Sequence, residues 1–339
     1  MEEMRGEVLP DWKASTTGPG FDTMTQPAVF IGVAVAALVT ALFLILNRMR
    51  SLKMACSAKS VPPFLDKQRK QMQLVEKLRV SPNTHKFRFR LEHPGQILGL
   101  PVGKHLKVFA PAPKPSVQGQ WNGVEDGEAQ YPEIERKYTP VSGNELKGYV
   151  ELVVKVYRRG EQKQFPDGGK MSQYLDSLKI GDNVDVMGPC GLIQYLGNGQ
   201  FLFNRRTVRK KHVGMLAGGT GITPMFQLSC AILRNAGCDT TQVSLLFANR
   251  TEEDILLRDE LEEMKEAYPD QFRVEFTVDT PSSTWRSYKG FIDTEMIRAT
   301  MPPPSPDTVI LLCGAPPMLA SCRRNLLQLG YAKEDILEF

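Results

Sequence analysis

VGMLAGGTGITPMFQLSCAILR, residues 213–234, passes from an apolar strand pattern through a glycine-rich turn into an apolar helical pattern. The glycines of the turn at 218–224 can adopt backbone conformations that a Cβ atom would strain. We expect Thr223 to cap the helix and Pro224 to take its first position, where a missing N–H costs nothing. Free N–H groups and the helix dipole attract phosphate there. The stretch predicts a nucleotide-binding turn. A structural loop is the alternative, because neither G-x-G-x-x-G nor the Gly-Lys-Ser/Thr ending of a P-loop is present.

Length and composition frame this prediction. The chain has 339 residues, of which 42% are apolar and 24% charged, enough for two globular domains and an appendage. A net charge of +4, scattered along the chain, argues against nucleic acid as a partner. The six cysteines show no C-x-x-C pair and the four histidines no metal spacing, so we expect a reducing compartment, no disulfide and no metal site.

The N-terminal region predicts a membrane anchor. Residues 27–46 form an uncharged stretch of 20 residues, long enough to span the hydrocarbon core of a bilayer. Acidic residues predominate before it, and Arg48, Arg50 and Lys53 follow it, which places the remainder in the cytosol. We therefore expect a non-cytosolic, lumenal leader at 1–26, one transmembrane helix at 27–46 and a linker at 47–71.

Two domains are expected after the linker. Residues 72–205 contain short strand patterns separated by Gly, Pro and Asn, which predict an antiparallel β-barrel; these patterns lie at 84–92, 105–110, 149–157 and 183–187. Between them, residues 112–134 are rich in Pro, Gly, Gln and acids, and we expect a solvated loop. Residues 206–339 alternate strands with helices, which predicts a doubly wound parallel α/β sheet with its ligand at the carboxyl ends of the strands. Its predicted strands are 213–217, 243–247, 273–278 and 308–313, and its helices include 253–267 and 318–329.

The barrel carries its own candidate chemistry. One extended segment holds three candidate groups: the forked guanidinium of Arg136, which can bind phosphate, the aromatic face of Tyr138 and the hydroxyl of Thr139. Residues 168–172, GGKMS, open a short helix and form a second anion-receptive turn. A surface arginine, a half-buried tyrosine and an ordinary Thr-Pro turn are the alternative. Two phosphate-type turns in two domains predict two bound nucleotides.

Taken together, the motifs resemble those of the NADH-cytochrome b5 reductases, within the ferredoxin-reductase-type flavoprotein superfamily. The resemblance covers about residues 72–339 and rests on five motifs in order: Arg136-x-Tyr138-Thr139-Pro140-x-Ser142, GGKMS at 168–172, Gly188-Pro189-x-Gly191, GGTGITP at 218–224 and CGAPPM at 313–318. It implies an FAD-binding barrel followed by an NADH-binding sheet. Two departures are visible: Ala315 replaces a usual proline, and the 112–134 segment is longer than expected.

The resemblance also implies roles for individual residues. Thr139, Lys155 and Cys313 would lie nearest the chemistry, with Cys313 beside the nicotinamide. The FAD site would consist of Arg136, Tyr138, Thr139, Pro140, Val153, Lys155, Gly169, Lys170, Met171, Ser172 and, from the second domain, Thr223. The NADH site would consist of Gly218, Gly219, Thr220, Cys313, Gly314, Pro317 and Met318.

Asp279 bears on the choice of nucleotide. It follows the strand pattern at 273–278, where a carboxylate can bind an adenosine ribose and repel the 2′-phosphate of NADPH. The alternative is an aspartate that merely begins a turn. We interpret Asp279 as an NADH-selecting residue.

The expected activity follows from the resemblance. A monomeric enzyme would pass a hydride from NADH to FAD and then single electrons to cytochrome b5, in support of lipid and sterol metabolism. Its membrane would be the endoplasmic reticulum, with the outer mitochondrial membrane second. A basic docking rim would include Lys155, Arg158, Arg159, Lys163 and Lys170. Two alternatives stay open: a membrane-anchored nucleotide-binding sensor without redox activity, and a flavin reductase with another haem or iron acceptor.

Overall fold

The computed structural model describes residues 61–163 and 165–339. The predicted leader, the predicted anchor at 27–46 and most of the predicted linker lie outside these residues. Across 61–163 and 165–339, helices of the length and apolar character needed to cross a bilayer are absent.

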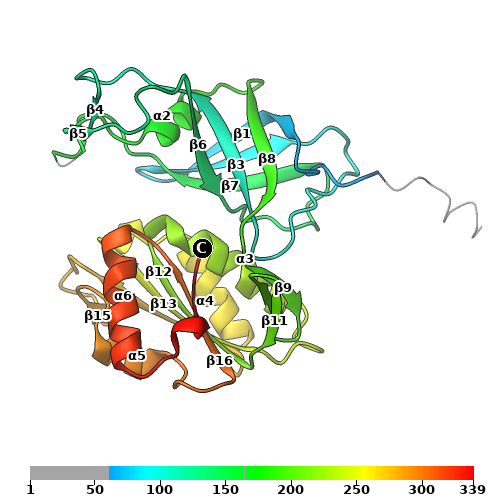
Figure 1. Ribbon diagram of the computed structural model, residues 1–339, viewed down its shortest axis with the longest axis vertical. Helices are drawn as coiled ribbons and strands as arrows, with labels where there is room; N and C mark the ends of the chain where they lie inside the picture. The colour runs from blue at the N-terminus through cyan, green and yellow to red at the C-terminus, as the bar shows by residue number, and fades with distance from the viewer. Residues whose placement is uncertain (1–60, 164) are drawn as a thin grey trace, which may run out of the picture. The chain divides into compact units, whose positions relative to one another are not determined.

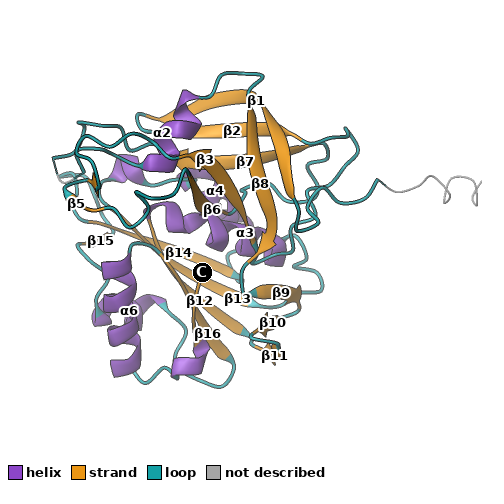
Figure 2. Ribbon diagram, turned by 45° about the horizontal axis from the view of Figure 1, so that its top comes forward, coloured by secondary structure: helices purple, strands orange, loops and turns teal. Residues whose placement is uncertain are grey.

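The first domain is built on an antiparallel sheet of six strands in the order β6-β3-β8-β1-β2-β7. Alternating residues of these strands point into one core, as Phe87 and Phe89 of β2 and Leu106 and Val108 of β3 show. The curled sheet is visible in Figure 2. It confirms the predicted antiparallel, barrel-like domain. The strands are β1 (Arg69–Ser81), β2 (Thr84–Arg90), β3 (His105–Pro111), β6 (Glu133–Tyr138), β7 (Tyr149–Lys155) and β8 (Asn183–Cys190), and helix α2 (Lys170–Ser177) packs on the same core.

The barrel begins earlier than the sequence predicts. Phe64 and Leu65 are buried, and their backbone N–H groups donate to the carbonyls of Ile97 and Leu98 over 3.0 Å each. Strand β1 then starts at Arg69. The linker boundary predicted at residue 71 is therefore wrong, because two apolar side chains within it belong to the core.

The second domain is built on a parallel sheet of six strands in the order β15-β14-β13-β12-β16-β17. Alternating residues of β12 serve two cores: Val213 and Met215 pack on the side of α3 and α4, while Leu216 packs on the side of α5 and α6. In Figure 1 the strands lie between orange-red α6 and yellow α4. The predicted doubly wound sheet is confirmed. Its strands are β12 (His212–Gly218), β13 (Gln242–Asn249), β14 (Phe272–Val278), β15 (Tyr288–Lys289), β16 (Thr308–Cys313) and β17 (Ile336–Glu338), and its helices are α3 (Ile222–Leu233), α4 (Arg258–Ala267), α5 (Thr294–Thr300) and α6 (Pro316–Gln328).

A small antiparallel sheet joins the two domains along the chain. Its strands are β9 (Gln194–Gly197), β10 (Gln200–Phe203) and β11 (Arg206–Arg209). Tyr195 and Phe201 pack into the core on the α3 side of the parallel sheet. This sheet is not among the predicted elements, because strands of four residues carry too little pattern.

Two helix starts differ from the predictions. The predicted helix at 253–267 is split into the 3₁₀ turn η2 (Glu252–Asp254) and α4, with Leu257 left-handed at φ 56° between them. Helix α3 begins at Ile222 after Gly221, so Thr223 does not cap it, and Pro224 takes the third position. The Thr223 hydroxyl instead donates to the Thr220 carbonyl over 3.2 Å. Pro224 is still tolerated, because the N–H groups of the first turn have no helical partner.

Candidate functional site: a cleft at the carboxyl ends of the parallel strands

A cleft of about 820 Å³ lies where the parallel strands end. It is bordered by Gly218 of β12, Asn249 of β13, Cys313 of β16 and Asp279, which follows β14. Strand β12 has β13 on one side and β16 on the other, so the order of strands reverses at this point. Crevices at such reversals are where open α/β sheets bind their ligands.

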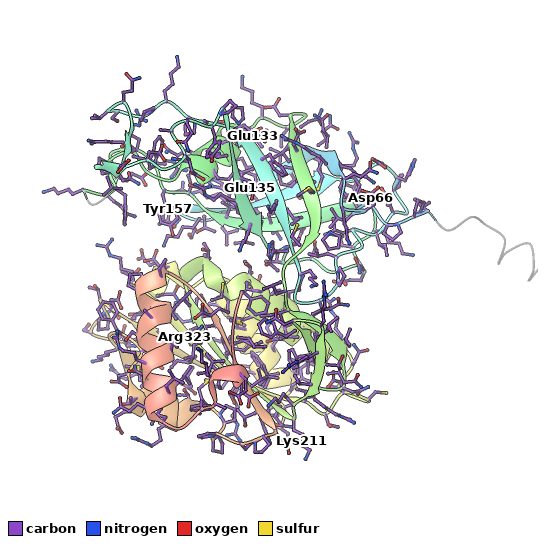
Figure 3. The ribbon with its side chains drawn as sticks, viewed as in Figure 1. Asp66, Glu133, Glu135, Tyr157, Lys211 and Arg323 are labelled. Atoms are coloured by element: carbon purple, nitrogen blue, oxygen red, sulfur yellow. The ribbon has the colours of Figure 1, made fainter. Side chains whose placement is uncertain are left out.

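The antiparallel domain supplies the facing side of the cleft. Thr139, Lys155 and His105 line it, and Tyr157, two residues beyond β7, lies at the same boundary (Figure 3). The cleft brings together eleven of the predicted site residues from two domains. They are Thr139, Lys155, Gly218, Gly219, Thr220, Thr223, Asp279, Cys313, Gly314, Pro317 and Met318. Their individual roles stay predictions.

The glycine-rich turn is pressed against the end of β16. A Cβ atom on Gly221 would lie 2.2 Å from the carbonyl oxygen of Cys313, and one on Gly218 would lie 2.3 Å from the Met318 sulfur. Glycine is therefore required at 221 for packing, since backbone cannot move aside as a side chain can. This packing aligns the 218–224 turn with the 313–318 loop on one edge of the cleft.

A partly buried ion pair connects the two sides of the cleft. The Lys155 ammonium donates to Asp254 Oδ1 over 2.5 Å, and the two side chains are 13% and 14% exposed. Burial alone would raise the pKa of the Asp254 carboxyl, but the bond and charge of Lys155 outweigh it and lower that pKa. The ion pair thus holds the Lys155 side chain beside the cleft.

Two titratable groups of the cleft are held neutral. Burial lowers the pKa of His105 to about 4, and the nearby charges of Lys137, Lys107 and Lys104 add to that effect. Burial raises the pKa of the Cys313 thiol to about 11, against a smaller opposing effect of Lys137. At neutral pH Cys313 is therefore a thiol that can contact a ligand, and a thiolate nucleophile is disfavoured.

Asp279 shares its corner of the cleft with two residues that the sequence analysis missed. Burial raises the pKa of Asp279, and the exposed Arg250 opposes this shift by its charge. Asn249 is 6% exposed, and neither atom of its side-chain amide has a hydrogen-bond partner among the described residues. A buried amide without partners is costly, so a hydrogen-bonding ligand at this position would stabilise it.

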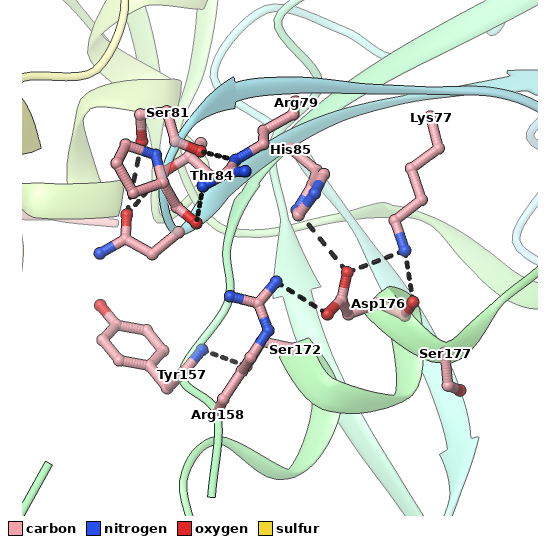
Figure 4. Close-up of polar contacts among 12 residues, drawn as sticks. Lys77, Arg79, Ser81, Thr84, His85, Tyr157, Arg158, Ser172, Asp176 and Ser177 are labelled. Carbon is pink, nitrogen blue, oxygen red and sulfur yellow. Dashed lines mark hydrogen bonds and ion pairs between the residues drawn. The ribbon is translucent and has the colours of Figure 1, made fainter. Parts of the chain in front are cut away.

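The remaining predicted site residues lie in the barrel, outside the cleft lining: Arg136, Tyr138, Pro140, Val153, Gly169, Lys170, Met171 and Ser172. Ser172 Oγ accepts from the Tyr157 N–H over 3.2 Å (Figure 4). Burial raises the pKa of the Tyr138 phenol, so it stays protonated. Val153 is 5% exposed and packs with core residues of the second domain.

The predicted basic rim is largely wrong. The Lys170 side chain is 7% exposed and that of Lys155 is 13% exposed, and both are paired with carboxylates. Arg158 pairs with Asp176 over 3.0 Å in the network shown in Figure 4. Only Arg159 and Lys163 of the predicted set are exposed. The sequence alone does not reveal which of these basic residues meet carboxylates from distant segments.

The 112–134 segment is also more ordered than predicted. It contains a hairpin of β4 (Gln120–Trp121) and β5 (Val124–Glu125), and Trp121 is 8% exposed. Trp121 Nε1 donates to the Gly168 carbonyl over 2.8 Å. The prediction of a solvated loop is therefore wrong for this hairpin, which docks on the second glycine-rich turn.

Further cleft residues were missed because they belong to no motif. They are His105, Lys137, Tyr157, Asn249, Arg250 and Phe291, the last of which is 82% exposed. Asn249 and Arg250 directly follow a predicted strand, so the rule that ligands bind at the carboxyl ends of strands could have indicated them. No comparable signal marks Lys137 or Phe291.

Comparisons with known proteins agree with this geometry. The family model for the oxidoreductase FAD-binding domain matches residues 71–195, and that for the oxidoreductase NAD-binding domain matches residues 215–324. NADH-cytochrome b5 reductase 2 of Xenopus laevis is 45% identical over 309 residues, covering 88% of this chain and 97% of the relative. NADH-cytochrome b5 reductase 1 of Homo sapiens is 46% identical over 270 residues, covering 78% and 83%.

Similarity to a solved structure indicates the same family. The cytochrome b5 reductase domain of Ulva prolifera nitrate reductase superimposes with a TM-score of 0.74 at 40% identity, covering 82% of this chain and 100% of that domain. The predicted enzyme class and the predicted cofactors, FAD and NADH, are confirmed by these findings. The chain belongs to the NADH-cytochrome b5 reductase family of FAD- and NAD-binding oxidoreductases.

Proposed function

We propose that this enzyme carries electrons from NADH through bound FAD to cytochrome b5, at the surface of a membrane. The supporting observation is the cleft, in which Thr139 and Lys155 of the FAD-binding domain face the carboxyl ends of four parallel strands of the NAD-binding domain. Two ring systems can meet in a cleft of about 820 Å³. The names of the relatives at 45% and 46% identity support cytochrome b5 as the acceptor.

The residues in place fit both cofactors. For NADH, the turn at 218–224 presents backbone without Cβ atoms, and the buried amide of Asn249 lacks a protein partner among the described residues. For FAD, the Thr139 hydroxyl and the Lys155 ammonium supply hydrogen-bond donors on the opposite side. When bound, FAD supplies the conversion between a two-electron hydride step and single-electron steps.

The protein's own contribution is orientation and charge. Asp254 holds the Lys155 ammonium in one position, where its remaining N–H groups can donate to acceptors in the cleft. The neutral Cys313 thiol packs at the end of β16 without adding negative charge. Neutral His105 can donate through one ring nitrogen and accept through the other. These residues would bind and align the two rings, and none would be required to transfer a proton.

An acidic haem protein would meet a small set of exposed cations. Lys137 lines the cleft, is exposed, and forms no ion pair with any residue in the described ranges. Arg159 and Lys163 are also exposed. We propose that these side chains steer an acidic partner to the mouth of the cleft, because exposed charges raise association rates.

The membrane part of the proposal rests on residues 27–46 and the basic residues that follow them. An anchored enzyme and an anchored acceptor would meet by diffusion in two dimensions, which raises their effective concentration. The endoplasmic reticulum is the proposed membrane, and the outer mitochondrial membrane is the second candidate.

Deletion of residues 1–50 tests the proposal. We expect NADH-dependent ferricyanide reduction to be unchanged, because the small acceptor needs only the cleft. Reduction of cytochrome b5 in vesicles should become slower. The Lys137→Ala variant should lose part of its rate with cytochrome b5 at low salt and lose little at high salt. Equal rates for full-length and truncated enzyme at both salt concentrations would contradict the anchor and the docking surface.

A further inference from the structure

The 112–134 segment, here called the insert, is held against the FAD-side glycine turn by reciprocal hydrogen bonds. The Asn122 N–H donates to Asp167 Oδ2 and the Asp167 N–H donates to Asn122 Oδ1, each over 2.8 Å. Trp121 Nε1 and Asn122 Nδ2 both donate to the Gly168 carbonyl, over 2.8 and 3.1 Å. Asp167 is only 3% exposed. The base of the insert is therefore a fixed part of the barrel.

This fixed base brings two carboxylates to the cations beside the turn. Glu128 accepts from Arg136 Nη1 and Nη2 over 2.7 Å each, a two-pronged pairing. The Lys170 ammonium donates to Asp126 Oδ1 over 2.6 Å and to Glu128 Oε2 over 2.9 Å. The bond from Arg136 holds the pKa of Glu128 at about 2, and the bond from Lys170 adds to this effect. Both carboxylates are thus fully ionised at neutral pH.

The same two cations are the natural partners of a diphosphate. Arginine's fork matches phosphate and carboxylate oxygens equally well. Helix α2 starts directly after Gly169, which has no side chain to cap it, so its first N–H groups also face an anion-receptive site. Without the insert this corner would carry two positive charges and a helix N-terminus.

The insert changes the charge of that corner. Two carboxylates cancel the two cations, and Lys170 has already committed two of its three N–H bonds. Its ammonium also lies 5.4 Å from the centre of the Trp121 ring. A diphosphate that binds the same Nη fork of Arg136 and more than one N–H of Lys170 must replace carboxylate oxygens that hold these donors.

We propose that Asp126 and Glu128 of the insert are an internal competitor for the diphosphate of FAD at Arg136 and Lys170. In the competing arrangement, the two carboxylates satisfy the two cations, as the hydrogen bonds of Glu128 and Asp126 show. When FAD binds, its phosphates replace the carboxylates, which turn outward while Trp121 and Asn122 keep the base of the insert in place. The insert thereby lowers the affinity for FAD.

The inference rests on the FAD site of the proposed function, and the dissociation constant for FAD tests it without any activity measurement. Purified full-length holoenzyme is dialysed against graded concentrations of FAD, and the flavin that remains bound is measured by absorbance. Glu128→Gln keeps the shape of the side chain and removes its charge. We expect the dissociation constant to fall about tenfold. Asp126→Asn should change it in the same direction by less, because Glu128 still holds Lys170.

Two matched variants give the experiment its controls. Glu125→Gln removes the same charge from the same insert, where Glu125 is exposed and has no ion pair among the described residues; it should change the dissociation constant by less than about twofold. Arg136→Ala should weaken FAD binding about tenfold, the opposite sign to Glu128→Gln. Urea unfolding of each variant checks that the fold is retained.

The outcomes separate the possibilities. Tighter FAD binding in Glu128→Gln than in Glu125→Gln supports competition. Unchanged or weaker binding in both Glu128→Gln and Asp126→Asn overturns it and makes the carboxylates positioning residues for the two cations. If wild-type enzyme binds no FAD at any concentration, the proposed function fails and the competition fails with it.

Discussion

The two glycine-rich turns, residues 168–172 in the barrel and residues 218–224 in the parallel sheet, share a local design and differ in their surroundings. Each leads into a helix and each needs glycine where backbone approaches closely: a Cβ on Gly168 would lie 2.3 Å from the Tyr157 carbonyl oxygen, and one on Gly221 would lie 2.2 Å from the Cys313 carbonyl oxygen. The 218–224 turn opens onto the cleft, whereas the 168–172 turn is covered by the insert and its cations are paired.

This difference shows that a phosphate-type turn does not by itself determine how available its site is. In the parallel sheet the strand order creates the opening at the carboxyl ends. In the barrel a segment more than 40 residues away in sequence decides which donors stay free. Local geometry predicts where a nucleotide can bind, and long-range contacts decide what competes with it.

The largest expected effect comes from an alanine at each close approach. Gly221→Ala and Gly168→Ala should each lower the free energy of unfolding by roughly 3 kcal/mol, because backbone atoms cannot yield to the new methyl group. In the Gly168→Ala variant the alanine would also be strained by its backbone conformation, since φ at this position is +70°. We expect Gly221→Ala to weaken NADH binding with FAD retained, and Gly168→Ala to lose FAD first.

Urea unfolding and titration with each nucleotide measure these effects. Gly237→Ala is the control, because a Cβ there meets nothing within 4 Å. If both glycine variants lost the same cofactor, the assignment of one nucleotide to each turn would be wrong.

The ion pair that joins the two sides of the cleft should have the next largest effect. Lys155→Met leaves the Asp254 carboxylate at 14% exposure without its partner. We expect a loss of about 2 kcal/mol in the free energy of unfolding, less than for a fully buried pair because both groups keep some contact with water. Lys211→Met removes an exposed pair, in which Lys211 is 72% exposed, and should change stability by less than about 0.5 kcal/mol. Similar losses in both variants would show that Lys155 is not specially held.

Burial of His105 predicts that the free energy of unfolding depends on pH. The 218–224 turn makes no such contribution. Its pKa is about 4 in the folded protein and 6.5 in the unfolded chain, so the unfolded chain binds more protons between these values. Stability should therefore fall as the pH falls through this window, by about 2 kcal/mol between pH 7 and pH 5. In His105→Gln that contribution is absent, so the difference in stability between wild type and variant should shrink at pH 5. A difference independent of pH would place His105 in an environment that accepts its charge.

Substitution of Asp279 should have the smallest effect, and it tests the role of this residue in the choice between NADH and NADPH. Asp279→Ala should narrow the preference for NADH over NADPH by about fivefold, roughly 1 kcal/mol, chiefly through tighter NADPH binding. The effect is modest because Arg250 already places a positive charge near this carboxylate. If the ratio of dissociation constants stays unchanged, Asp279 serves only to begin its turn.

Much of this architecture could be predicted from the sequence. Buried parallel strands are continuous apolar runs, so β12, β13 and β16 were located within two residues at each end. The position of the cleft followed from the rule that ligands bind at the carboxyl ends of parallel strands. Cys313 and Asp279, both predicted site residues, line this cleft.

Other features could not be predicted, for physical reasons. Helix α5 has seven residues and β9 four, too few for a period to emerge. The pairing of Lys170 with Asp126 joins residues 44 positions apart, and composition alone assigned the acids to solvent. Phe64 and Leu65 look like part of a polar linker until the strands that bury them are in place.

The optical spectrum of the purified full-length enzyme tests the central claim most directly. The account predicts a flavin absorption band, retained after dialysis, that bleaches when NADH is added without oxygen and returns when an electron acceptor follows. NADPH at the same concentration should bleach it less. A colourless protein that stays colourless after incubation with FAD, or a flavin band that NADH leaves unchanged, would contradict the account that the cleft joins the two cofactors.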